Sequence, residues 1–206
     1  MIIEAIVSTT FAENTWLVGN EDSRECIIID PGSGFKRIKN KINNLDLAPQ
    51  LLLNTHLHPD HLVASKELQD QYQIPNKACE YEKNLFNAFT QIAQGLGFKG
   101  LKKPEINAWL QDNDILEKFG FTIKVIHTPG HSPGSCCYLI NEKHLFSGDT
   151  LFAGSIGRTD LPYGSAEQMR TSLQRIADLP IKTKIYPGHG QTSTLEKELN
   201  NNPYLI

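Results

Sequence analysis

Thr55-His56-Leu57-His58-Pro59-Asp60-His61 is the stretch around which this sequence is organised, and it directly follows the apolar run Leu51-Leu52-Leu53-Asn54. Three imidazoles and one carboxylate fall within six positions. Imidazole nitrogen and carboxylate oxygen suit zinc, iron or manganese, so this density favours a metal site over a merely polar turn. Side chains alternate along an extended segment, so we expect His56 and His58 to point the same way. Pro59 should then end that segment and let Asp60 and His61 begin a helix.

Length and composition indicate an ordinary globular chain. With 206 residues, 39% of them hydrophobic and 21% charged, the sequence fits a single domain over residues 1–206. Its net charge of -3 and pI near 6.2 give no basic field for nucleic acid or an anionic membrane. The N-terminus has no basic leader and no run of about 18 apolar residues occurs, so we expect a soluble, cytoplasmic protein. Cys136 and Cys137 are adjacent in an apolar strand pattern, which favours reduced, buried thiols over disulfides.

The order of elements repeats in the two halves of the chain. In the first half, apolar runs predict strands at 2–7, 15–18, 25–29 and 51–53, and apolar periodicity predicts helices over 35–47, 62–72 and 81–95. In the second half, strands are predicted at 115–116, 121–126, 135–140, 144–146 and 184–186, with a helix over 165–177 that Ser165 caps. Two such halves predict an α/β (α+β) sandwich of two sheets with helices outside, its strand-end loops sharing one edge. We expect the aromatic stripe of 81–95 to be core, with the option of overhanging the histidine-rich turn.

Further candidate ligands follow later strands. His131, Asp149 and His189 each come directly after a glycine, which lets the backbone turn tightly near an ion. His127 is expected to be a structural or hydrogen-bonding residue rather than a ligand, and His144 an exposed hairpin residue. Asp30 ends an earlier strand, where it either orients a ligating histidine or serves as a simple turn residue.

Four motifs carry a resemblance to a known family. They are His56-Leu57-His58-Pro59-Asp60-His61, Thr128-Pro129-Gly130-His131-Ser132, Ser147-Gly148-Asp149-Thr150-Leu151-Phe152 and Pro187-Gly188-His189-Gly190. Together they resemble the metal motifs of the metallo-β-lactamase fold superfamily, and the chain is most similar to its glyoxalase II-like hydrolases. The resemblance covers essentially the whole chain and implies an αββα sandwich. It also implies two divalent metal ions, with zinc as the first choice and iron or manganese as alternatives. By this resemblance, one ion is bound by His56, His58 and His131, the other by Asp60, His61 and His189, and Asp149 bridges them.

The chemistry that this resemblance implies is hydrolysis of a small-molecule thioester such as S-D-lactoylglutathione. Two metal ions about 3.5–4 Å apart share a water, lower its pKa and create a bridging hydroxide. The same ions stabilise the charge that develops on the carbonyl oxygen. Asp60 is placed to ligate and to orient the hydroxide. The leaving group is a thiolate whose conjugate acid has a pKa of roughly 8.5, so no strong general acid is needed.

The residues that would bind the substrate match the family's pattern less closely than the metal motifs do. Full-length glyoxalase II has an additional C-terminal helical region for glutathione, which this sequence is expected to lack. After the bridging aspartate the family supplies a basic residue and a tyrosine, whereas Gly157-Arg158-Thr159-Asp160 keeps the base and replaces the tyrosine by Asp160. Arg158 therefore either binds a substrate carboxylate or pairs with Asp160.

The same sequence motifs are also compatible with a second function. The Gly-Arg-Thr-Asp stretch is also similar to persulfide dioxygenases of the same superfamily, which bind a single iron through two histidines and one aspartate. Here those ligands would be His56, His131 and Asp149, a facial triad with open positions. Oxygen uptake would distinguish this activity from hydrolysis.

Overall fold

The structure of the protein is a computed structural model that describes residues 1–32, 34–98 and 100–205. By its internal contacts the chain forms two compact units. Unit 1 contains Met1–Ala78 and Lys83–Trp109, and unit 2 contains Cys79–Glu82 and Leu110–Ile206. Within the described ranges, no helix combines the length and the apolar character needed to cross a membrane.

Unit 1 is built on a mixed six-stranded sheet with the order β1-β2-β3-β4-β5-β6. Its strands are β1 (Ile2–Val7), β2 (Asn14–Gly19), β3 (Glu25–Ile29), β4 (Ala48–Asn54), β5 (Asn76–Cys79) and β6 (Ala108–Leu110). The pairs β1–β2 and β2–β3 are antiparallel, whereas β3–β4 and β4–β5 are parallel. Because β3 and β4 are parallel neighbours, the loops that follow their carboxyl ends emerge at the same edge of the sheet.

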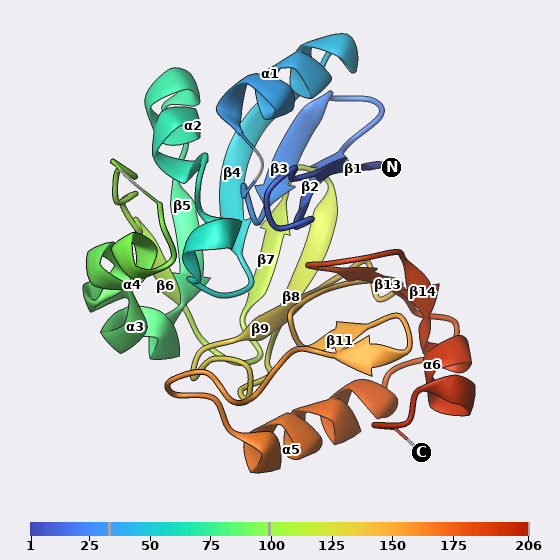
Figure 1. Ribbon diagram of the computed structural model, residues 1–206. Coiled ribbons are helices and arrows are strands. Elements are labelled where there is room, and N and C mark those ends of the chain that lie inside the picture. Colours follow the sequence, from blue (N-terminus) through green and yellow to red (C-terminus); the bar gives the residue numbers. More distant parts are fainter. Residues whose placement is uncertain (33, 99, 206) are drawn as a thin grey trace. The chain divides into compact units, whose positions relative to one another are not determined.

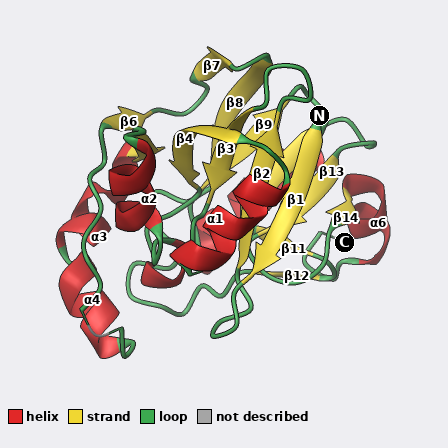
Figure 2. Ribbon diagram, turned by 90° about the horizontal axis from the view of Figure 1, so that it is seen from above, coloured by secondary structure: helices red, strands yellow, loops and turns green. Residues whose placement is uncertain are grey.

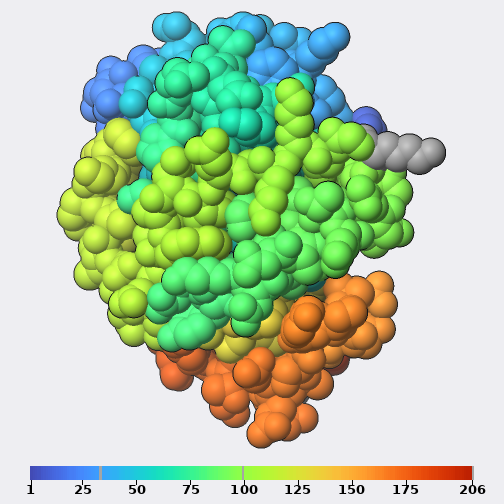
Figure 3. Space-filling model, turned by 90° about the vertical axis from the view of Figure 1, so that its left-hand side faces the viewer, coloured from blue at the N-terminus to red at the C-terminus, as the bar shows by residue number. Residues whose placement is uncertain are grey.

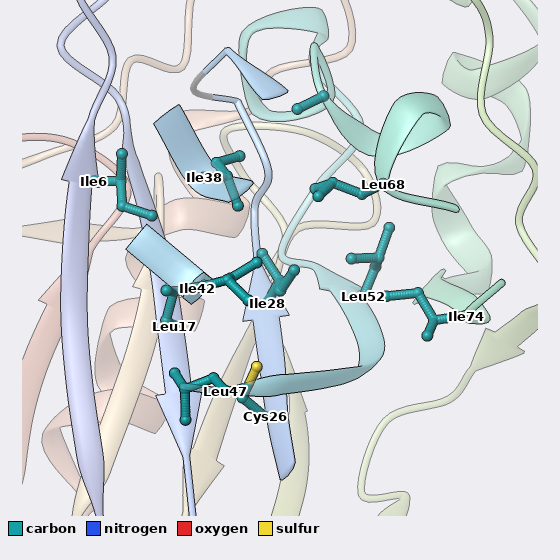
Figure 4. Close-up of a cluster of buried hydrophobic side chains, with 11 residues drawn as sticks. Ile6, Leu17, Cys26, Ile28, Ile38, Ile42, Leu47, Leu52, Leu68 and Ile74 are labelled. Carbon is teal, nitrogen blue, oxygen red and sulfur yellow. The ribbon is translucent and has the colours of Figure 1, made fainter. Parts of the chain in front are cut away.

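Two helices, α1 (Phe35–Asn44) and α2 (Ser65–Tyr72), cover one face of this sheet (Figures 1 and 2). Figure 4 shows the core between them, in which side chains of both helices meet side chains of the strands; the labelled members include Ile38, Ile42, Leu68, Leu17, Ile28 and Leu52. Leu51 and Leu53, which alternate with Leu52 along β4, are also buried. The prediction that this strand is covered on both faces is therefore confirmed.

The predicted helix over 81–95 is wrong as a single element. Glu80–Glu82 forms a separate 3₁₀ turn, followed by α3 (Lys83–Asn87) and α4 (Phe89–Gly95). The 3₁₀ turn packs within unit 2 while the two helices pack within unit 1. The chain therefore passes from one unit to the other after Glu82, although the helical spacing of apolar residues continues through this point. The aromatic stripe is core, as predicted: Phe86 and Phe89 lie in a buried cluster with Leu57 and Leu62 of the histidine-rich turn.

A return segment, residues 100–107, lies along α2 and is attached to it by Gln69. The Gln69 side chain donates to the Glu105 carbonyl and accepts from the Glu105 N–H, both at 3.0 Å. Figure 3 shows the teal atoms of α2 beside the yellow-green atoms of this segment. These reciprocal bonds give the segment a fixed path although it has no regular secondary structure.

Unit 2 has its own mixed sheet, with the order β14-β13-β10-β9-β8-β7. Its strands are β7 (Ile115–Lys118), β8 (Phe121–His127), β9 (Cys136–Ile140), β10 (His144–Gly148), β13 (Lys184–Pro187) and β14 (Ser193–Thr194), and a separate hairpin consists of β11 (Leu151–Phe152) and β12 (Ser155–Ile156). The pair β10–β13 is parallel, and β8–β9 and β9–β10 are antiparallel. It follows that β8, β10 and β13 all run in one direction and end at the same edge.

Helices α5 (Ala166–Ala177) and α6 (Leu195–Asn201) pack on one face of this second sheet. The predicted cap of α5 is confirmed, because the Ser165 hydroxyl accepts a hydrogen bond from the Gln168 N–H. Helix α6 was not predicted. The sequence signals for this helix are the Thr194 cap and the buried Leu195. A helix of seven residues is too short to show a clear apolar periodicity.

Candidate metal centre

The histidine-rich turn follows β4 in unit 1 and brings its imidazoles together. The ring centroids of His56 and His58 are 4.8 Å apart, and those of His56 and His61 are 4.2 Å apart. Asp60 and His61 lie in a single 3₁₀ turn, Pro59–His61, with Pro59 at its start. The predicted long helix from residue 62 is wrong at its start, since α2 begins only at Ser65. Leu62 instead ends the turn and is buried in the cluster beneath α3 and α4.

Asp30 connects two of these histidines. It follows β3, adopts a left-handed φ of 50°, and is 1% exposed. Its Oδ1 accepts from the Thr55 N–H at 2.7 Å, and its Oδ2 accepts from the Thr55 hydroxyl at 2.6 Å and from His61 Nδ1 at 3.2 Å. The Thr55 oxygen in turn lies 3.1 Å from His56 Nδ1. Of the two alternatives for Asp30, the structure thus supports a residue that orients histidines rather than a simple turn residue.

This network determines the tautomers of both imidazoles. An ionised carboxylate only accepts hydrogen bonds, so His61 donates from Nδ1. The Thr55 hydroxyl gives its proton to Asp30, so its oxygen accepts from His56 Nδ1. In both rings the proton sits on Nδ1 and the lone pair on Nε2, which is the form that binds a cation.

The donors predicted in unit 2 follow three strands that end at one edge of its sheet. His131 comes after β8, Asp149 after β10 and His189 after β13. The Gly188 N–H donates to the Gly148 carbonyl at 2.8 Å, which joins the turns that carry Asp149 and His189. The parallel strands thereby hold these turns in register.

Asp149 is the centre of this second group. Its Oδ2 is 3.5 Å from His131 Nε2 and 3.6 Å from His189 Nε2. In unit 1, His61 Nε2 is 3.7 Å from Asp60 Oδ2. These separations are long for direct hydrogen bonds. Donors about 2.0–2.2 Å from one tetrahedral ion lie roughly 3.3–3.6 Å apart, so the observed spacing agrees with ligands that share a cation.

His131 is held by backbone on its far side. Its Nδ1 lies 2.8 Å from the Arg158 carbonyl oxygen, which only accepts, so the lone pair again resides on Nε2. The preceding Gly130 has a φ of 142°, and a Cβ there would lie 2.5 Å from the backbone of Met169. Only glycine fits this turn, which agrees with the predicted need for glycine before a donor.

The Arg158 side chain pairs with Asp160. Its Nε and one terminal nitrogen donate to the two carboxylate oxygens at 2.8 and 2.9 Å. Both side chains are exposed, at 62% and 70%. Donation from Arg158 lowers the pKa of Asp160 to about 2. The structure therefore shows the ion pair that was one of the two alternatives for Arg158, and its backbone carbonyl serves His131 as well.

The two remaining histidines have different surroundings. His127 Nε2 bonds to the Pro133 carbonyl at 2.8 Å and its ring stacks on Tyr81, which agrees with the structural role expected for it. The expectation that His144 is exposed is wrong. It opens β10, is partly buried, and its Nδ1 bonds to the Tyr186 hydroxyl at 2.9 Å. Burial, followed by the charges of Lys184 and Lys143, lowers its pKa.

The donor chemistry fits a divalent metal ion. In each unit the described donors are imidazoles and carboxylates, and the three histidines for which hydrogen bonds determine the tautomer (His56, His61 and His131) present Nε2 lone pairs. Nitrogen and oxygen donors of this kind suit zinc, iron and manganese. The connection of Asp30 to His56 through the Thr55 hydroxyl was not predicted from the sequence, although the position of Thr55 directly before His56 was an available signal.

Comparisons with known proteins agree with this site. Residues 8–189 match the metallo-beta-lactamase superfamily. The chain is 36% identical over 210 residues to hydroxyacylglutathione hydrolase GloC of Haemophilus influenzae, covering 100% of this chain and 98% of that protein. Among solved structures it is similar to BLEG-1 B3 metallo-beta-lactamase, with a TM-score of 0.92, 32% identity and 100% of each chain covered. It is also similar to TTHA1623 in a di-iron-bound form, with a TM-score of 0.87, 32% identity, and 98% of this chain and 100% of that chain covered.

These similarities confirm the predicted αββα fold, with its two mixed sheets flanked by helices. The groups of histidine and aspartate are consistent with the binuclear metal site of a metal-dependent hydrolase. The chain belongs to the metallo-beta-lactamase superfamily.

Proposed function

We propose that this chain is a glyoxalase II-like thioesterase that hydrolyses S-D-lactoylglutathione or a related thioester. The observation that carries the proposal is the set of imidazoles held with their lone pairs on Nε2 by Asp30, Thr55 and the Arg158 carbonyl. The similarity to a hydroxyacylglutathione hydrolase over the full length of the chain supports the thioester as substrate class.

In this proposal the side chains divide into two ligand sets. One ion would be held by His56, His58 and His131 and the other by Asp60, His61 and His189, and Asp149 would be a ligand of both. When bound, a pair of divalent ions lowers the pKa of a shared water and stabilises negative charge on a carbonyl oxygen. Zinc, iron and manganese all suit these donors.

The protein's own groups then orient the reactants. Asp60 has a second role besides ligation, because its carboxylate accepts a proton of the attacking water and so directs the oxygen at the thioester carbon. Asp30 keeps His56 and His61 in the ligating tautomer. The thiolate can leave without a strong general acid because the pKa of its conjugate acid, the thiol, is roughly 8.5.

Arg158 is the proposed substrate-binding residue. Its guanidinium is exposed and already oriented by Asp160, and a substrate carboxylate would replace Asp160 as a bidentate acceptor. Because the contact of His131 is with the Arg158 backbone, the side chain can exchange partners without moving the imidazole.

The test is metal analysis of the purified protein beside two assays. We expect about two ions per chain, hydrolysis of S-D-lactoylglutathione, and no oxygen uptake with glutathione persulfide. The Asp149→Ala variant should lose both activity and most bound metal. One iron per chain with oxygen consumption would instead establish the dioxygenase, and a metal-loaded protein inactive on a panel of thioesters would contradict the proposal.

A further inference from the structure

Glu82 is a buried carboxylate with no role in the proposed reaction. It ends the 3₁₀ turn Glu80–Glu82 in unit 2 and is 0% exposed. Its Oε1 accepts from the Ser132 hydroxyl and from the Gly134 N–H, each at 2.7 Å. A buried carboxylate is retained at a cost in desolvation, so these short bonds require an explanation.

The two bonds hold the loop that carries His131. Ser132 directly follows His131, and its own N–H donates to the Ser135 hydroxyl oxygen at 3.1 Å. The Ser132 and Ser135 oxygens are 2.7 Å apart. Because Ser132 gives its hydroxyl proton to Glu82, Ser135 must donate to Ser132. The carboxylate of Glu82 therefore sets the direction of the two hydroxyl hydrogen bonds of this turn, from Ser132 to Glu82 and from Ser135 to Ser132.

The loop also approaches Glu82 very closely. A Cβ on Gly134 would lie 2.4 Å from the Glu82 backbone nitrogen and 2.6 Å from its Cγ. No other residue fits at 134 without separating the loop from the carboxylate. The glycine thus makes the contact possible, as expected of a built anchor rather than an accidental neighbour.

His131 is consequently held from two directions. The Arg158 carbonyl accepts from its Nδ1 at 2.8 Å, and Glu82 fixes the backbone that follows it. We propose that Glu82 is a positioning residue, whose carboxylate fixes the loop of residues 131–134 so that His131 Nε2 faces Asp149. This inference rests on the proposed function in so far as His131 is a metal ligand.

A carboxylate suits this task better than an amide. Hydrogen bonds to an ionised acceptor are roughly twice as strong as neutral ones. In Glu82→Gln the carbonyl oxygen can still accept both bonds, more weakly, whereas Glu82→Ala leaves two buried donors without their acceptor. The two variants therefore form a graded series.

Glu198 provides a matched control. It is 1% exposed and accepts from the Gly154 N–H at 2.7 Å, from the Asn202 side-chain amide at 2.9 Å and from the Ser193 hydroxyl. Like Glu82, Glu198 accepts from a glycine amide and a serine hydroxyl in unit 2. It has Asn202 as an additional donor, and none of its three partners is adjacent to a proposed metal ligand. Because it disturbs three hydrogen bonds, Glu198→Gln should lower the melting temperature at least as much as Glu82→Gln.

The experiment measures zinc affinity by chelator competition, and the imidazole N–H signal of His131 by NMR in the metal-free protein. We expect Glu82→Ala to weaken binding of one of the two zinc ions about 10-fold and to speed solvent exchange of that N–H. Glu82→Gln should show a smaller change in the same direction, and Glu198→Gln should leave both readouts at the wild-type value. If Glu82→Ala does not fold, Glu82→Gln decides.

Two results would overturn the inference. One is wild-type zinc affinity with an unchanged His131 signal in the Glu82 variants. The other is an equal loss in Glu198→Gln, since the effect would then reflect stability alone. If wild-type protein bound no zinc and hydrolysed no thioester, the proposed function would fail, and the His131 signal in metal-free protein would still decide the role of Glu82.

Discussion

Replacement of Asp30 by asparagine tests the network behind the histidine-rich turn without changing its shape. In the wild-type protein, Oδ1 accepts from one donor and Oδ2 from two. An asparagine puts an NH₂ group at one of these positions. If NH₂ replaces Oδ1, it faces the Thr55 N–H, and a buried donor without an acceptor costs about 1–3 kcal/mol.

The other orientation affects the imidazoles directly. If NH₂ replaces Oδ2, His61 can only accept through Nδ1, which moves its proton to Nε2. The Thr55 hydroxyl must then donate to His56, which moves the proton of that ring as well. Neither ring could then bind a cation through Nε2. Loss of such a partner typically lowers metal affinity 10- to 100-fold, equivalent to about 1.4–2.8 kcal/mol.

The assay compares zinc affinity and urea unfolding of metal-free protein. We expect Asp30→Asn to retain a cooperative unfolding transition and to lower zinc affinity by that factor if NH₂ takes the Oδ2 position, or to lose stability instead if NH₂ takes the Oδ1 position. Asp112→Asn is the control, because Asp112 also accepts from a backbone N–H, that of His127, and from the Arg175 side chain. It should lose stability but keep its zinc. Wild-type zinc affinity together with wild-type stability in Asp30→Asn would refute the argument, because each orientation of the amide predicts a loss in one of the two measurements.

Three further predictions concern single side chains. Asp149→Ala should abolish hydrolysis and most zinc binding, whereas His144→Ala should retain both, because His144 bonds to Tyr186; equal losses, measured by metal analysis and a thioester assay, would contradict the ligand assignment. The Asp160 carboxyl should titrate near pH 2 by NMR, below its ordinary value of 3.8, because Arg158 donates to it. The ion pair therefore stabilises the folded state fully above about pH 4 and this contribution disappears as the pH falls through 2; in Arg158→Ala the midpoint should move back toward 3.8. Arg158→Ala should also raise KM for a carboxylate-bearing thioester more than it lowers kcat, and unchanged kinetics would return Arg158 to a purely structural role.

The predictions from sequence succeeded where the chemistry is local. The spacing of His56, His58 and His61 directly after an apolar strand predicted a turn crowded with imidazoles, and the structure has one. Glycines before His131 and Asp149 predicted tight turns, and Gly130 and Gly148 both have positive φ. Helix boundaries were less accurate.

The failures share a physical cause, which is that contacts distant in sequence override local pattern. Tyr81 fits the helical periodicity of 81–95, yet it stacks on His127 with ring centroids 4.5 Å apart and belongs to a different unit from α3. Glu82 reads as one more charge at the start of a helix, yet its partners lie 50 and 52 positions along the chain. No local pattern encodes such a pairing. The sequence therefore identifies the donors that chemistry requires, whereas the groups that aim those donors become visible only when the fold brings distant segments together, and it is these groups that Asp30→Asn and Glu82→Gln test.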